Sequence, residues 1–105
     1  MANPTSSVIV YVTYQGGPDT RFDRDYYVER HLPLVMHSWQ GHGLESAVAF
    51  FPVGSQTGTI VICECRSRNE NAVDAAFSSA ETPAVMADVS RFTDVAPVRL
   101  RAVPL

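Results

Sequence analysis

The chain has 105 residues, with eight arginines, no lysine and eleven acidic residues, and its formal net charge is -3 at pH 7. The absence of lysine excludes a lysine Schiff base and a Walker A phosphate loop, because both need an amine at a defined position. An acidic chain without a basic cluster offers no footprint for a phosphate backbone, so we expect no nucleic-acid partner. Any catalysis must use His, Tyr, Asp, Glu, Cys or Arg side chains.

The length predicts a single domain over residues 1–105 with one small core. The N-terminal residues carry no positive charge before a short apolar run at 8–12, so we expect neither a signal peptide nor a membrane span. Cys63 and Cys65 are poorly placed to bridge each other on an extended segment, which indicates reduced thiols. Together these features predict a soluble, cytoplasmic protein.

The first half of the chain predicts a strand, a long helix and a second strand. Residues 8–14 are almost all β-branched or aromatic, which is typical of a strand covered on both faces. A helical pattern begins at Asp23, a good N-cap, and continues to about Gln40. Pro33 lies inside this pattern and predicts a kink or a division of the helix. Residues 45–51 predict the second strand.

The second half predicts a hairpin, two shorter helices and a last strand. A connection at 52–58 joins the second strand to a third at 59–65, and these two strands should pair antiparallel. Ser67 and Glu70 have the spacing of a capping box, which predicts a helix from 67 to about 79. Thr-Pro at 82–83 predicts another helix to about 92. Alternation at 98–103 predicts the last strand.

This order, βαββα(α)β, predicts an α+β domain with a ferredoxin-like four-stranded antiparallel sheet and helices on one face. The other face would then be bare and apolar, which is unusual for a soluble monomer. We therefore expect a homodimer in which two sheets face each other as a dimeric α+β barrel. Glu64, alone among apolar neighbours on the bare face, could meet Arg99 or Arg101 there.

The first helix carries the main candidate for chemistry. Projected at about 100° per residue, it places His31 inside an apolar arc and turns His37 to the opposite face. The members of the arc are Tyr27, Val28, Leu32, Leu34, Val35 and Trp39. Tyr27 lies one turn from His31 and could share a proton with it or fix its tautomer. The alternative is that His31 is a packed, hydrogen-bonded core residue.

Three further residues are secondary candidates. Cys63 and Cys65 share one face of their strand, and the simplest interpretation makes them small buried hydrophobic residues. If they face the helices they share a layer with His31, and a Cys-His pair can activate a nucleophile or base. Asp88 lies at the edge of its helix's apolar face, where it could hold the imidazole or cap nearby backbone. No second ligand cluster accompanies Cys-x-Cys, so we expect no metal site.

Two segments resemble a known family. Residues 22–35, FDRDYYVERHLPLV, resemble the signature of EthD-domain proteins, whose first helix carries a Tyr-Tyr pair, a following histidine and then Pro-Leu. Residues 88–94, DVSRFTD, resemble that family's Asp-x-x-x-Phe-Thr-Asp segment before the last strand. With the order of elements, the resemblance covers nearly the whole chain and implies a dimeric α+β barrel.

The resemblance also implies where the chemistry lies. Pockets of similar barrels lie between sheet and helices, where His31 is expected to point. In a lactone isomerase branch a cysteine on the third strand joins the histidine of the first helix, and Cys63 or Cys65 could correspond to it. The loop at 52–58 is short for the family, which leaves the pocket more open.

Two functions follow as expectations. The first is a catabolic enzyme without cofactor, of isomerase, monooxygenase or cyclase type, acting on a small carbonyl, enol or lactone with His31 as acid or base. Its other catalytic candidates are Tyr27, Cys63, Cys65 and Asp88. The second is a non-catalytic dimer that binds a small hydrophobic molecule or serves an oxygenase or ether-degradation system. Related barrels that hold haem through a histidine make haem binding a third, weaker possibility.

Overall fold

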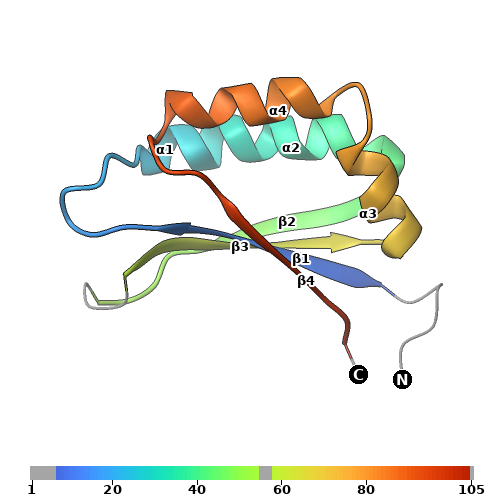
Figure 1. Ribbon diagram of the computed structural model, residues 1–105, viewed down its shortest axis with the longest axis horizontal. Helices are drawn as coiled ribbons and strands as arrows, with labels where there is room; N and C mark the ends of the chain where they lie inside the picture. The colour runs from blue at the N-terminus through green and yellow to red at the C-terminus, as the bar shows by residue number, and fades with distance from the viewer. Residues whose placement is uncertain (1–6, 55–57, 105) are drawn as a thin grey trace.

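A computed structural model of the chain describes residues 7–54 and 58–104. Four strands form one antiparallel sheet, and all the helices of this part of the chain cover one of its faces (Figure 1). The expectation of no signal peptide, which concerns residues 1–6, and the tip of the predicted connection at 55–57 lie outside the described residues. None of the described helices has the length and apolar character needed to cross a membrane.

The strands are β1 (Val8–Gln15), β2 (Leu44–Phe50), β3 (Thr59–Ser67) and β4 (Val98–Ala102). Their order in the sheet is β2-β3-β1-β4, and every neighbouring pair is antiparallel. The fold class predicted from the sequence, a ferredoxin-like α+β sheet with helices on one face, is confirmed. The hairpin of β2 and β3 is confirmed with it.

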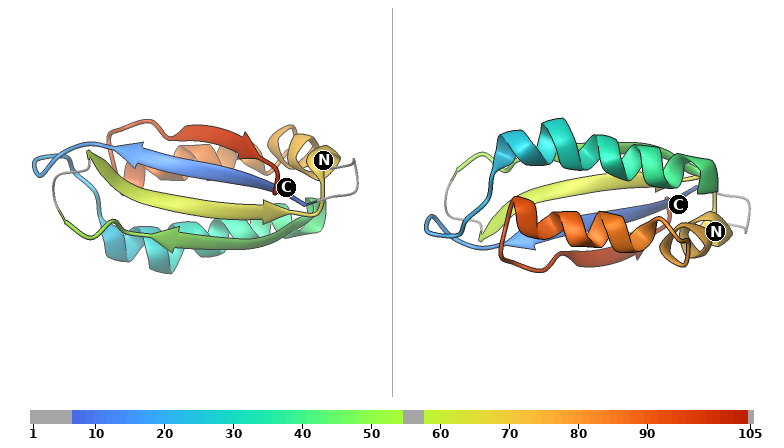
Figure 2. Two further views of the ribbon diagram at one scale, coloured as in Figure 1. Left: turned by 90° about the horizontal axis from the view of Figure 1, so that it is seen from below. Right: turned by 90° about the horizontal axis from the view of Figure 1, so that it is seen from above.

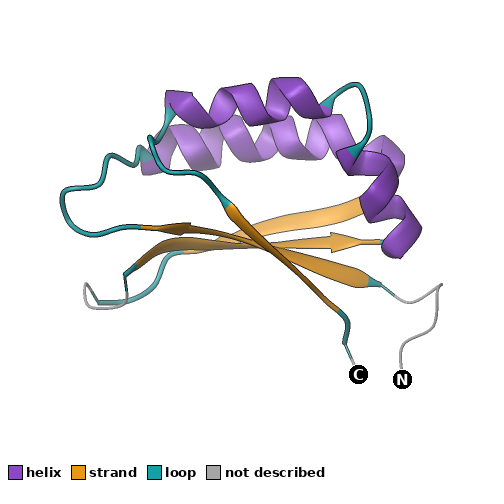
Figure 3. Cartoon of the chain, in the orientation of Figure 1, coloured by secondary structure: helices purple, strands orange, loops and turns teal. Residues whose placement is uncertain are grey.

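The long first helix is continuous but changes its type. It comprises α1 (Arg24–Tyr26), a π-helical turn η1 (Tyr27–His31) and α2 (Leu32–Trp39), with no loop between them (Figure 3). Asp23 caps it as predicted, since its carboxylate accepts a 3.0 Å hydrogen bond from the Tyr26 amide. Pro33 is the second residue of α2, one residue after the π turn, and its missing N–H removes one hydrogen bond from this continuous helix.

A short 3₁₀ turn, η2 (Gln40–His42), follows α2 and ends at Gly43, whose φ is 108°. This left-handed conformation favours glycine. The space is also restricted, because a Cβ added at Gly43 would meet the Cβ of Ala72 at 2.6 Å. Gly43 therefore lets the chain pass close beneath the next helix on its way into β2.

That next helix is α3 (Glu70–Phe77), and its cap corrects the prediction from sequence. Asn69 is the N-cap and accepts a 2.8 Å hydrogen bond from the Ala72 amide. Ser67 is instead the last residue of β3, paired with Val8. The predicted capping box is wrong because strand pairing continues through Ser67, and Asn69 is itself a good cap.

The last helical segment is α4 (Thr82–Asp88) followed by the 3₁₀ turn η3 (Val89–Arg91). Glu81 occupies the N-cap position. The Thr82 hydroxyl donates a 2.7 Å hydrogen bond to the Ala76 carbonyl and accepts one of 3.0 Å from the Trp39 indole. Thr82 thus ties α2, α3 and α4 together at one end of the helical layer.

The two faces of the sheet differ. On the helix side the buried β3 residues are Val61, Cys63, Cys65 and Ser67. The opposite face, which no described helix covers, is seen from below on the left of Figure 2. It carries large apolar side chains that are about half exposed or more in the single chain. These residues are Val48, Phe50, Val98 and Leu100. This exposed apolar face of the single chain is consistent with a dimeric barrel.

The suggested meeting of Glu64 with Arg99 or Arg101 is wrong. Arg101 forms a 2.8 Å ion pair with Asp74 of α3, and the Arg99 guanidinium lies 4.6 Å from the centre of the Phe77 ring in the same helix. Both arginines therefore face the helices. Glu64 alternates with the buried residues of β3 and lies on the other face.

Candidate functional site

His31 lies on the π turn and is buried, with 4% of its surface exposed. Its Nδ1 lies 3.0 Å from Oδ2 of Asp88, the last residue of α4. The prediction that His31 points inward and His37 outward is confirmed. Of the predicted apolar arc, Val28 is turned outward and is 45% exposed, because the π turn changes the angular spacing that an α-helical projection assumes.

Tyr26 is the second partner of Asp88. Its hydroxyl donates a 2.7 Å hydrogen bond to Oδ1, while Arg91 Nε lies 3.7 Å from the same oxygen. Tyr27, which the sequence favoured as the polar partner of His31, instead stacks beside its ring, with the ring centres 5.7 Å apart and an interplanar angle of 22°. Both oxygens of Asp88 are thus engaged, and the carboxylate is held in one orientation.

These contacts define the charge state of the pair. Burial opposes ionisation of Asp88, but hydrogen bonds from Tyr26 and His31, together with the charges of His31 and Arg91, outweigh it and lower the pKa of this carboxyl. Burial lowers the pKa of His31 below its ordinary 6.5, against the opposing effect of Asp88. Near neutral pH we therefore expect a neutral imidazole that donates its Nδ1 proton to an ionised Asp88.

The other ring nitrogen, Nε2, is then an unprotonated base. Within residues 7–54 and 58–104, the hydrogen bond of His31 uses Nδ1 alone, and every fully buried side-chain nitrogen or oxygen has a partner. Nε2 must therefore be accessible rather than fully buried. Because His31 lines a cavity between the sheet and the helices, its lone pair is available to a molecule bound there.

That cavity lies where the resemblance placed the pocket. The cavity has a volume of about 50 Å³, several times the roughly 10–15 Å³ that one water molecule needs. Its walls are mostly aliphatic and aromatic. Its polar and sulfur-bearing lining residues are Tyr14, Tyr27, His31, Cys63, Cys65, Ser67, Met86 and Arg99. Such a lining suits a small, largely apolar molecule with few polar groups.

The sequence left open whether Cys63 or Cys65 lies in the pocket, and both of them line this cavity. They are free thiols, buried, with 3.7 Å between their sulfur atoms. Hydrogen bonding from Cys65 lowers the pKa of Cys63 despite burial, and the hydroxyl of Tyr27 adds to the effect. The pKa of Cys65 is raised by its bond to Cys63 and by burial. Cys63 is thus the more readily ionised thiol.

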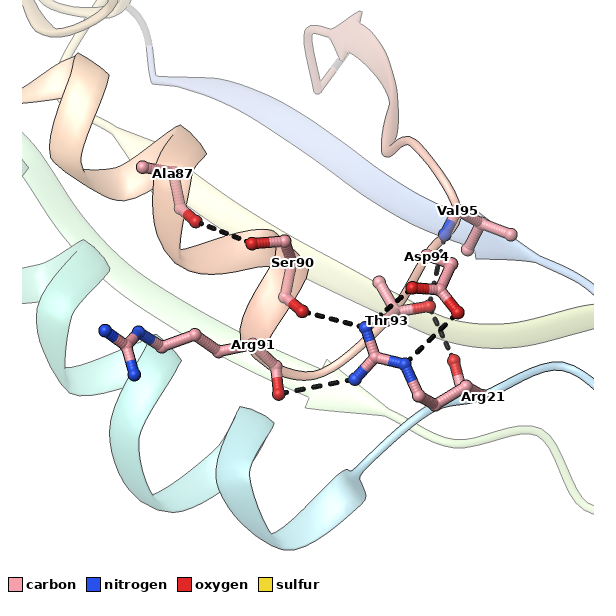
Figure 4. A network of polar contacts seen from close by, with 7 residues as sticks. All are labelled: Arg21, Ala87, Ser90, Arg91, Thr93, Asp94 and Val95. Atoms are coloured by element: carbon pink, nitrogen blue, oxygen red, sulfur yellow. Dashed lines mark hydrogen bonds and ion pairs between the residues drawn. The ribbon is translucent and has the colours of Figure 1, made fainter.

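A network of polar contacts fixes the segment that carries Asp88 (Figure 4). The Arg21 guanidinium donates to both carboxylate oxygens of Asp94, at 3.2 and 2.8 Å, and to the Ser90 and Arg91 carbonyls at 2.8 and 3.4 Å. The Thr93 hydroxyl donates back to the Arg21 carbonyl at 2.7 Å. Arg21, just before the first helix, thereby holds the turn that follows Asp88.

The two segments that resemble the EthD signature also meet each other. The Asp23 amide donates a 2.8 Å hydrogen bond to the Phe92 carbonyl, and Phe22 pairs with Thr93 in an isolated β-bridge. The Phe92 ring is fully buried and lies 4.6 Å from the His31 ring, centre to centre. Both segments therefore build one site, with His31 and Asp88 at its centre.

No group of three or more His, Cys, Asp or Glu side chains in the described part of the chain is arranged to hold a metal ion. His42, the third histidine, lies 3.3 Å from Glu81 at the surface, away from this cavity's lining.

Comparisons with known proteins identify the fold. No protein-family model matches the sequence, and no curated protein matches it either. Among solved structures, an EthD-like protein from Ralstonia eutropha JMP134 is 23% identical, with a TM-score of 0.76 over 94% of this chain and 92% of that one. An ethyl tert-butyl ether (EthD) family protein from Bacillus halodurans C-125 is 18% identical, with a TM-score of 0.73 over 94% and 99%.

A hydroxynitrile lyase from Passiflora edulis has a similar structure at 11% identity, with a TM-score of 0.66 over 97% of this chain and 96% of that one. The chain therefore has the ferredoxin-like α+β fold of the EthD-like proteins. The α+β fold that the two sequence motifs implied for the single chain is confirmed. At these identities the likeness concerns fold, and the chemistry must be argued from the site.

The sequence did not single out Tyr26, Arg21 or Arg99 as parts of the site. The Tyr-Tyr pair was visible, but an α-helical projection separates Tyr26 from His31 by about 140° and favoured Tyr27. Arg21 and Arg99 carried no local signal, because their roles depend on segments distant in sequence.

Proposed function

We propose that the chain is an EthD-like enzyme that needs no cofactor and transfers a proton on a small carbonyl, enol or lactone, with His31 as acid or base. The observation that carries this proposal is the His31–Asp88 pair, whose free Nε2 is available to an apolar cavity. Isomerase, monooxygenase and cyclase reactions of this type all begin by removing a proton from an activated C–H or O–H group.

In the proposed reaction, Nε2 of His31 takes a proton from a carbon or oxygen acidified by a neighbouring carbonyl. The imidazole becomes a cation, and ionised Asp88 stabilises it through the Nδ1 proton. His31 then returns the proton to another atom of the same ligand, which completes an isomerisation. Asp88 does not itself take the proton, because its pKa lies below its ordinary value.

Tyr27 and the two cysteines have secondary roles in this proposal. The pKa of Tyr27 is raised far above its ordinary value by burial and by the neighbouring thiols, so its hydroxyl stays protonated and can exchange its hydrogen bond to Cys63 for one to an enolate oxygen. Cys63 is the thiol better suited to ionise, and Cys65 supports it through the contact between their sulfur atoms.

The setting of this enzyme is proposed as well. We infer a single-domain, cytoplasmic homodimer. The homodimer is supported by the sheet face opposite the helices, which exposes apolar side chains that a second copy would cover. A hydroxynitrile lyase with a similar structure is consistent with lyase or proton-transfer chemistry on this fold. No metal or organic cofactor is needed for the proton transfer proposed.

The second candidate is a dimer that binds a small hydrophobic molecule without converting it, or that serves an oxygenase or ether-degradation system. The predominantly apolar cavity favours this function, as does the similar fold of the ethyl tert-butyl ether (EthD) family protein from Bacillus halodurans. Under it, replacement of His31 would lower stability and leave ligand affinity nearly unchanged.

Hydrogen–deuterium exchange at carbon separates the two functions. The protein would be incubated in deuterated water with five-membered unsaturated lactones and cyclic diketones, and exchange would be followed by proton NMR. The enzyme should accelerate exchange of at least one compound, and His31→Gln should abolish the acceleration while His37→Gln retains it. Equal rates with the native protein and His31→Gln would remove the catalytic assignment.

A further inference from the structure

Arg99 gives the cavity a feature that the proposed proton transfer does not use. It lies on β4, paired with Val12 of β1, and both residues line the cavity. Its guanidinium lies over the Phe77 ring, 4.6 Å from the ring centre. Since Arg99 is exposed while its neighbours Val12 and Phe77 are partly buried, it lies at the rim of the cavity, where an entering molecule meets it.

Among the residues that line this cavity, Arg99 is the sole side chain that carries a full charge near neutral pH. No Asp or Glu lines the cavity, and His31 is expected to be neutral there. The cavity therefore combines apolar walls, one neutral base and one cation. A bound anion would meet no opposing carboxylate in the lining.

Arg99 also has no protein anion to neutralise it in the described part of the chain, where its guanidinium contacts the face of Phe77. Arg101, two residues further along β4, provides the contrast. It lies on the same face and near the same ring, at 5.9 Å, but forms a 2.8 Å ion pair with Asp74. Of these two neighbouring guanidinium groups, Arg101 is thus engaged by the protein and Arg99 is available to a ligand.

We propose that Arg99 binds the carboxylate of the ligand, and that this ligand is a small hydrophobic carboxylic acid whose apolar body enters the cavity toward His31. The inference rests on the proposed function for the part of the ligand that reacts at His31, and it adds a substrate class to that function. A planar guanidinium presents paired N–H donors that match a carboxylate in a two-point contact. The stacking on Phe77 orders that group before the ligand arrives.

Electrostatics supports a monoanion over a neutral or doubly charged ligand. The chain has a formal charge of -3, so its overall field disfavours anions, and a local cation is needed to bind one. A neutral molecule would leave Arg99 without a charged partner. A second carboxylate would have to enter apolar walls without a counter-charge, which is costly.

Ligand binding tests this inference without requiring turnover. Phenylacetate and cyclohexylacetate would be titrated into the full chain at about pH 8 and low salt, with chemical shifts of the cavity residues followed by NMR. Their uncharged amides are the matched probes. We expect each carboxylate to bind about tenfold or more tightly than its amide, and added salt to reduce that difference.

Variants then show which residue causes the preference for the carboxylate over the amide. Arg99→Gln should bring carboxylate and amide to within about twofold of each other, as expected when one charge-assisted contact is lost. Arg101→Gln, the matched control on the same strand and face, should keep the preference. A native protein that binds both probes equally, binds neither at millimolar concentration, or keeps its preference in Arg99→Gln would overturn the inference.

His31→Gln separates this inference from the proposed function. Carboxylate binding that survives in His31→Gln, with the same dependence on Arg99, supports Arg99 as the carboxylate anchor even if deuterium exchange fails. Deuterium exchange that depends on His31 but is equally fast for carboxylic acids and for their amides would support His31 as the base. It would refute Arg99 as the residue that binds the carboxylate.

Discussion

Asp88 Oδ2 lies 3.0 Å from His31 Nδ1, although the two residues are 57 positions apart in the chain. The contact joins the first helix to the end of α4, and Tyr26 holds the other oxygen of the same carboxylate at 2.7 Å. One ring nitrogen of His31 is thereby fixed as a donor and the other is left as a base.

Stability should fall in acid in two stages. A histidine whose pKa is lowered in the folded state binds fewer protons there than when unfolded, so its contribution is complete above pH 6.5 and declines as the pH falls below that value. The lowered pKa of Asp88 adds a second loss as the pH falls toward and below 3.8. Urea unfolding between pH 8 and pH 3 measures both stages.

The variant His31→Gln should be less stable at neutral pH and should lose less stability than the native protein between pH 7 and the folded-state pKa of His31. His37→Gln is the control, because that side chain is exposed and should leave the profile unchanged. A native profile that is flat below pH 6.5 would argue against a buried neutral imidazole.

Phe92 should be among the most sensitive core positions. Its ring is fully buried and contacts the rings of His31, Tyr14, Tyr26 and Tyr27. Truncation in Phe92→Ala should lower the free energy of unfolding by about 3–5 kcal/mol, the usual cost of removing a buried phenyl group. Denaturant unfolding measures it, and Val53→Ala, at a fully exposed position, should change stability by less than about 0.5 kcal/mol.

The bare sheet face should mediate self-association. Leu100 is 65% exposed on that face and pairs with Tyr11 of β1. In Leu100→Glu, a charge would be buried in an apolar interface, so a dimer seen for the native protein by light scattering should become a monomer. The same charge in Val53→Glu, outside the sheet, should leave the dimer intact. A native chain that is monomeric at micromolar concentration contradicts the dimer.

Much of the fold could be predicted from local pattern. Strands such as Val8–Gln15 are marked by β-branched residues, and Asp23 caps its helix as its position indicates. The failures arose where distant contacts override local preference. Ser67 has the sequence environment of a cap but is held in β3 by pairing with Val8. Arg99 and Arg101 of β4 were assigned to the wrong face of the sheet. The alternation of apolar and polar residues does not tell which face of a strand lies against the helices.

The site, like the fold, was predictable only where local sequence pattern determines it. His31 was found because one polar residue inside an apolar arc is conspicuous, and Asp88 because its helix edge faces the same layer. Tyr26 was missed because the π turn brings residues five apart together, and an α-helical projection cannot show that. The thiols of Cys63 and Cys65 shared a face by simple period-two spacing, but only the three-dimensional structure shows that this face lines the cavity.

The most direct test of the central claim is the ¹⁵N NMR titration of the His31 ring in the native protein and in Asp88→Asn. The account predicts a neutral ring protonated on Nδ1 at pH 7, with a pKa below 6.5 in the native protein. That pKa should fall further in Asp88→Asn, because the Asp88 charge supports the imidazolium. A ring protonated on Nε2, or a pKa that does not respond to Asp88→Asn, would contradict it.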